Sequence, residues 1–135
     1  MKLVPLTLLV FVAPALAGEC LTYSGEVTLR GALSEHTFPE QPNYQSIAKG
    51  DAPATIFFIS PPKPFCVAAG NPNNNEPSES QVARVQLVFP SKVDGYGPLR
   101  PYLLKEVECT GSLFHAISGH HHSPVLLSNA KCHAA

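Results

Sequence analysis

The sequence predicts an all-β fold with one short helix, held together by two disulfides. Five segments have the alternating or β-branched pattern of strands, whereas one short segment has helical spacing. Four cysteines are spread widely along the chain, which is typical of disulfides in a small exported domain.

The N-terminal segment predicts export. Lys2, the apolar run from Leu3 to Val12 and the small residues that end at Ala17 form the pattern of a signal peptide, residues 1–17. The apolar run is shorter than the ~20 residues that span a bilayer, so no membrane span is expected. We expect cleavage near Ala17 and a periplasmic or secreted single domain of residues 18–135.

The charge of the mature chain argues against a nucleic-acid partner. Loss of Lys2 leaves eight basic and ten acidic residues, a net charge of −2. Nucleic-acid-binding domains usually carry a basic face.

The predicted elements follow one another as three strands, a short helix and two strands. In the first strand, Glu26–Leu33, apolar residues alternate with polar ones, and Ala54–Ser60 is β-branched and aromatic. Pro98 fits the first turn of the helix. The remaining elements are the third strand 83–89, the helix 96–105, and the strands 106–116 and 124–132.

This order is typical of an OB-fold, a five-stranded Greek-key barrel with its helix between strands three and four. Gly31 and Gly111 fall where the first and fourth strands would bend. A β-sandwich, the alternative, would need about seven strands. In an OB-fold the loops after strands one and four flank the binding face, so the loops 35–53 and 115–124 are expected to meet.

The cysteines are expected to pair as Cys20–Cys66 and Cys109–Cys132. If the last two strands form a hairpin that turns at residues 119–122, Cys132 lies opposite Cys109 and Leu126 lies opposite His115. Cys20 and Cys66 then remain, at neighbouring ends of the first two strands. The Asn-rich segment 71–80 is expected to be a flexible surface loop.

Four motifs, spread along nearly the whole mature chain, resemble those of a bacterial exported family catalogued as domain of unknown function 4431. They are "HTFPEQPNYQSIAKGD", "PFCV", "VQLVF" and "TGSLFHAISGHHHSPVLL". The resemblance implies a shared fold and brings no established activity.

The histidines suggest a metal site, because neutral imidazoles bind zinc or copper. In extended chain the side chains of His120 and His122 point to one side, and that of His121 to the other. The candidate ligands, brought together by the two loops, are His36, His115, His120 and His122. In the alternative, His115 packs under the loop and the triplet is solvated or makes structural hydrogen bonds.

Further binding residues are expected on the same two loops. They are Phe38, Tyr44, Asp51, Phe114 and His121. Asp51 follows a glycine, which favours a turn role over a ligand role.

Two functions from different classes fit these residues. The first is an exported binding module that holds a small ligand or transition metal, zinc or copper, between the two loops. The second is a periplasmic interaction protein, an inhibitor or accessory factor, that contacts a protein partner and uses its histidines structurally. The sequence contains no recognisable catalytic motif, so we expect a protein that is not an enzyme.

Overall fold

The computed structural model describes residues 2–5, 8 and 19–135. The predicted signal-peptide cleavage site lies outside the described residues, so the export prediction is not tested by the structure. Within the described ranges, no helix is long and apolar enough to cross a membrane.

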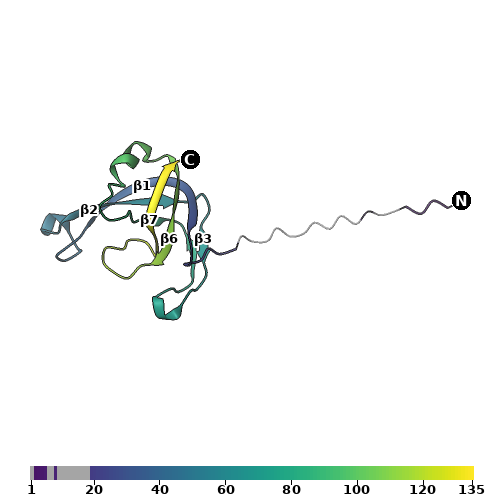
Figure 1. The fold of residues 1–135 in the computed structure, drawn as a ribbon, viewed down its shortest axis with the longest axis horizontal. Helices are drawn as coiled ribbons and strands as arrows, with labels where there is room; N and C mark the ends of the chain where they lie inside the picture. Colours follow the sequence, from purple (N-terminus) through teal and green to yellow (C-terminus); the bar gives the residue numbers. More distant parts are fainter. Residues whose placement is uncertain (1, 6–7, 9–18) are drawn as a thin grey trace.

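Five strands form a sheet that closes on itself in the order β1-β2-β5-β7-β6. Figure 1 shows β1, β2, β6 and β7 of this sheet. Neighbouring strands are antiparallel except β5 and β7, which are parallel. The mostly β architecture with five principal strands agrees with the sequence prediction. The bounds are β1 Val27–Pro39, β2 Pro53–Ser60, β5 Val85–Leu87, β6 Glu106–His115 and β7 Val125–Ala134.

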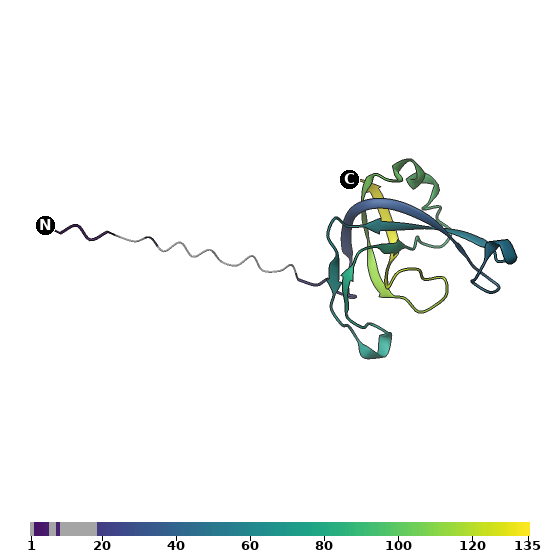
Figure 2. The same cartoon turned by 180° about the vertical axis from the view of Figure 1, so that it is seen from behind.

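Strand β1 is longer than predicted and changes partner along its length. It pairs with β6 up to Ala32 and with β2 from Ala32 to Pro39, so it curves around the sheet (Figure 2). A Cβ at Gly31 would overlap the backbone oxygen of Ser60, so this bend requires glycine. The predicted loop 35–53 is therefore wrong in its bounds: it spans 40–52, and His36 and Phe38 lie on the strand.

A second, two-stranded sheet was not predicted. It consists of β3 (Phe65–Val67) and β4 (Glu79–Val82), and the 3-10 helix η2 (Pro72–Asn74) lies between them. Strands of three and four residues are too short to show a clear alternation in sequence. The segment 71–80, predicted as a loop, thus contains a helical turn and the start of a strand.

The predicted helix is a 3-10 helix, η3 (Gly97–Tyr102), and its Leu99 packs into the core. Pro101 lies inside it and cannot donate a backbone hydrogen bond, which limits its length. A third 3-10 helix, η1 (Ile47–Lys49), lies in the loop between β1 and β2. The core fills the closed sheet, with Phe57, Ile59 and Leu87 among its fully buried side chains.

Both predicted disulfides, Cys20–Cys66 and Cys109–Cys132, are present. The predicted hairpin register holds at Cys109–Cys132 but is wrong by one residue near the turn, where His115 pairs with Val125 rather than Leu126. The reason is a bulge beside Asn129, whose φ of 50° places it in the left-handed region.

Candidate functional site

The two predicted loops meet at the carboxylate of Glu40. His120 Nδ1 donates to Glu40 Oε2 at 2.7 Å, and His122 Nε2 lies 3.3 Å from Glu40 Oε1. The Glu40 side chain is only 11% exposed. One buried carboxylate from the β1–β2 loop thus binds two members of the triplet in the β6–β7 loop, and both loops lie on the same side of the sheet (Figures 1 and 2).

Aromatic packing extends this contact onto strand β1. The His122 ring stacks on Phe38 with a centroid separation of 3.8 Å, and His36 packs against Phe38 at 4.4 Å. His122 is mostly buried, whereas the side chain of His120 is 55% exposed. His122 therefore acts as packing within the joined loops, and His120 presents its imidazole at the surface.

Tyr44 completes a chain of polar groups that leads from the buried carboxylate to solvent. Its hydroxyl lies 3.3 Å from His120 Nε2, and the His120 Nδ1 proton faces Glu40. With this tautomer, Nε2 accepts from the tyrosine hydroxyl. The tyrosine ring lies over Gly119, where a Cβ would come within 3.1 Å of the ring.

Buried Gln86 on β5 anchors the other side of the β6–β7 loop. Its amide oxygen accepts from the His122 backbone N–H at 2.7 Å, and its amide nitrogen donates to the His120 carbonyl at 3.1 Å. Its backbone N–H donates to the hydroxyl of Ser123. The triplet is thus fixed by a buried side chain of β5.

Asp51 organises the β1–β2 loop. Its carboxylate accepts three backbone hydrogen bonds, from the N–H groups of Ser46, Gln45 and Asn43, at 2.7–2.8 Å. The first two of these bonds are the main reason that the pKa of Asp51 is lowered. Asp51 therefore has the turn role that its sequence context favoured.

His121 has its partners outside the Glu40 cluster. Its Nδ1 accepts from the Ile117 backbone N–H at 2.9 Å, and its ring meets Phe114 edge-on. Burial lowers the pKa of His121, and the neighbouring His120 and His122 lower it further. The neutral ring suits this position, because a proton on Nδ1 would oppose the Ile117 donor.

His115 does not join the other candidate ligands. Its Nε2 lies 2.7 Å from Glu79 Oε1 on β4, so it connects β6 to the two-stranded sheet. Within residues 2–5, 8 and 19–135, no group of three or more His, Cys, Asp or Glu side chains is placed to hold a metal ion. The structure brings His120 and His122 together on Glu40 and leaves His115 with Glu79; metal binding stays a prediction.

Sequence reasoning missed Glu40 and Gln86, the two residues that position the triplet. Glu40 lies between Pro39 and a Gln-Pro pair, a context in which a glutamate is usually solvated. The one feature of the sequence that pointed to Glu40 was its position in the predicted loop 35–53, which was expected to face the histidines.

The joined loops also carry exposed apolar side chains. Tyr44 is 38% exposed, Ile47 43% and Ile117 72%. These three residues belong to the two loops that the Glu40 contacts hold together.

Comparison with known protein families gives a match over part of the chain. Residues 84–128, from the start of β5 into β7, match the model of the family described as "Domain of unknown function (DUF4431)". The family resemblance seen in the sequence is thereby confirmed over the segment that contains η3, β6 and the histidine triplet. No curated protein and no solved structure matches the chain.

Proposed function

We propose that the chain is an exported binding module with an OB-fold-like Greek-key barrel, and that the two joined loops, 40–52 and 116–124, form its binding surface. The strand order and the parallel pairing of β5 with β7 support the barrel assignment. Two disulfides support an oxidising, extracytoplasmic compartment.

The observation that carries the proposal is the pair of contacts that Glu40 makes with His120 and His122. These contacts hold two segments distant in sequence at the position where OB-folds bind their ligands. They also present one imidazole and one phenol, from His120 and Tyr44, at the surface. Such groups suit a polar small ligand or, after rearrangement, a transition metal.

Metal capture at this position would require His120 and His122 to exchange their contacts with Glu40 for contacts with the ion. The resulting donor set, two imidazoles and one carboxylate, is suited to zinc or copper. The test is a titration of zinc and of copper into the untagged mature chain. We expect at least tenfold weaker binding for His120→Ala/His122→Ala and unchanged binding for the control His133→Ala; equal curves for all three proteins would contradict the metal assignment.

Exposed apolar side chains favour a second candidate, a protein partner. Tyr44, Ile47 and Ile117 are exposed on the two loops that the contacts of Glu40 hold together, and where such side chains form a contiguous patch they mark an interaction site. A photo-crosslinking residue at Ile117 should then give a defined protein adduct in cells. The control places the photo-crosslinking residue at Lys105, an exposed position outside the two loops. Equal labelling of the partner from both positions would contradict a specific partner.

A further inference from the structure

A cavity of about 480 Å³ lies at the end of β7 remote from the histidine loop, between that strand and η3. Its apolar wall includes Phe89, Leu99 and Tyr102. The volume falls within the ~300–1,000 Å³ typical of ligand pockets. Since each strand residue advances the chain by ~3.3 Å, the distance from the start of β7 to the cavity is about 20 Å.

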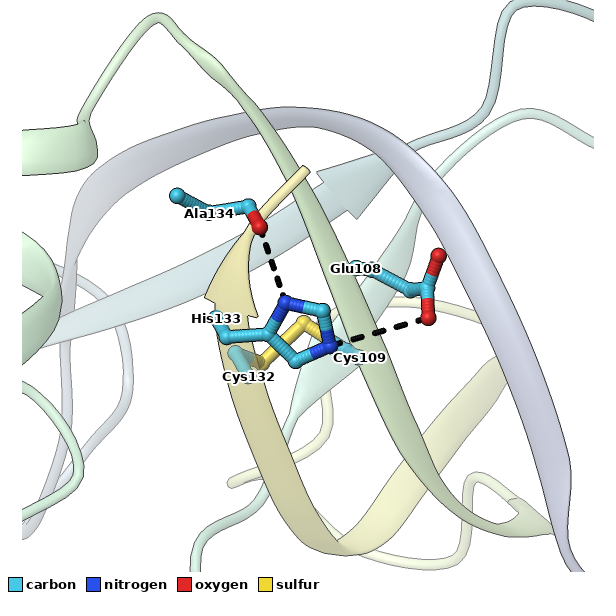
Figure 3. The surroundings of a disulfide bond; sticks show 5 residues. All are labelled: Glu108, Cys109, Cys132, His133 and Ala134. Carbon is cyan, nitrogen blue, oxygen red and sulfur yellow. Dashed lines mark hydrogen bonds and ion pairs between the residues drawn. A yellow bond between two sulfur atoms is a disulfide. The ribbon is translucent and has the colours of Figure 1, made fainter.

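The register of β6 and β7 determines which backbone groups face this cavity. The Cα atoms of Cys109 and Cys132 are 4.1 Å apart, which is typical of a pair without mutual backbone hydrogen bonds, because hydrogen-bonded pairs lie ~5.5 Å apart. The N–H and C=O of Cys132 therefore point away from β6. Figure 3 shows this pair with Ala134 on the same strand.

Neighbouring hydrogen bonds support the same assignment. The Ala130 N–H points away from β6 and donates to the Val88 carbonyl at 3.0 Å, whereas the Ala135 N–H donates to Glu106 on β6 at 3.2 Å. From Ala130 onward, even-numbered residues of β7 thus direct their backbone N–H and C=O groups away from β6, to the outer edge of β7. Odd-numbered residues direct theirs to β6.

Beyond Ala130 this outer edge has no partner strand in the described part of the chain. Strand β5 pairs with β7 at Leu126 and Leu127 only, and its last contact is the bond from Ala130 to Val88. All five residues from 130 to 134 line the cavity. An unpaired strand edge and an apolar cavity therefore lie side by side.

We propose that this edge and the cavity bind an extended peptide segment of a partner protein, which adds to β7 as a further strand. The peptide backbone would bond to Cys132 and to the Ala134 N–H, and one large apolar side chain would occupy the cavity. Two charged residues of opposite sign, Asp94 and Lys131, line the cavity. The Asp94 carboxylate accepts the backbone N–H groups of Tyr96 and Gly97, whereas Lys131 has no ion-pair partner among the described residues, so an acidic residue beside the apolar one fits at Lys131.

A second copy of the chain fits this site poorly. If two β7 strands paired edge to edge, each would offer the other Ala130, Lys131, Cys132, His133 and Ala134. None of these side chains is a large apolar group that could fill the cavity. The expected partner is therefore a different polypeptide.

The test uses the oxidised mature chain and a pool of capped hexapeptides in which apolar and acidic residues are varied. We expect recovery of peptides with one large apolar residue beside an acidic one, and amide shifts confined to β7 130–134 and η3. Ala134→Pro should weaken binding at least tenfold, because proline removes an edge donor that has no role in the sheet. Lys131→Glu should weaken binding of the acidic peptides, and the matched Lys105→Glu should not.

An N-methylated peptide provides the same test without a change to the protein, should Ala134→Pro alter the fold. Methylation of the amide that pairs with the Cys132 carbonyl should cost at least tenfold in affinity. Failure to recover any peptide would overturn the proposal, as would peptide binding that neither Ala134→Pro nor N-methylation weakens. Amide shifts confined to the loops 40–52 and 116–124 would also overturn it. So would a dimer of the chain that Ala134→Pro abolishes, because the edge would then bind a second copy.

Discussion

Replacement of Glu40 by alanine tests whether this carboxylate joins the two loops. The change removes the acceptor of both His120 and His122. The contact with His122 is mostly buried, and a lost charge-assisted hydrogen bond of this kind costs ~1.5–3 kcal/mol. The contact with exposed His120 is worth at most ~0.5 kcal/mol after solvent screening.

We therefore expect Glu40→Ala to lower the free energy of unfolding by about 2 kcal/mol, and Tm by roughly 8 °C for a domain of this size. Thermal unfolding followed by circular dichroism measures the shift, and amide exchange should accelerate in both loops. The matched control is Glu35→Ala, which removes an exposed carboxylate 4.0 Å from Arg100 and should change stability by less than ~0.5 kcal/mol. Equal stabilities of the two variants, with unchanged exchange in the loops, would refute the role of Glu40.

Three further changes address the same loops. Gly119→Ala places a methyl group about 3.1 Å from the Tyr44 ring, so the Tyr44 hydroxyl should leave His120; unchanged His120 ring signals in NMR spectra would contradict this contact. Asp51→Asn should accelerate exchange of the loop amides bound by its carboxylate. Because the folded pKa of Asp51 is lowered from 3.8, its stabilising effect is present above pH ~3.8 and is lost as pH falls through the folded value, so wild type and variant should converge in acid. The pKa of His121 in the folded chain is lowered from 6.5, so as pH falls the unfolded chain takes up the His121 proton before the folded chain does. Below pH ~6.5 the wild type should therefore lose stability relative to His121→Gln. Parallel curves of stability against pH for the two proteins would contradict the buried neutral ring.

Much of the architecture was predictable because it depends on local patterns. Alternation and β-branched composition identified the five principal strands, and hairpin geometry paired Cys109 with Cys132. The meeting of the two loops followed from the expected strand order, without knowledge of any contact between them. Local patterns did not show that β1 continues to Pro39, since "EHTFP" lacks a clear apolar alternation.

The contacts that position the histidines could not be predicted in the same way. Glu40 and Gln86 are polar residues whose burial depends on partners 80 and 34 positions away in the chain. A buried glutamate and a solvated one look alike in sequence, because only the fold supplies the donors that compensate burial. The same reason explains why His115 was grouped with the triplet although Glu79 binds it.

The bulge beside Asn129 explains how β7 can pair with β5 near the histidine loop while it keeps its register with β6 at Cys132. If the register at Cys132 continued to the turn, the Leu127 carbonyl would face β6 and could not accept the Val88 N–H, which it does at 2.9 Å. The extra residue reverses which residues face outward, so β7 bonds to β5 through Leu127 and again through Ala130. Closure of the sheet beside the histidine loop therefore depends on this irregularity, whereas the Cys109–Cys132 register by itself directs the backbone groups of Cys132 to the unpaired edge.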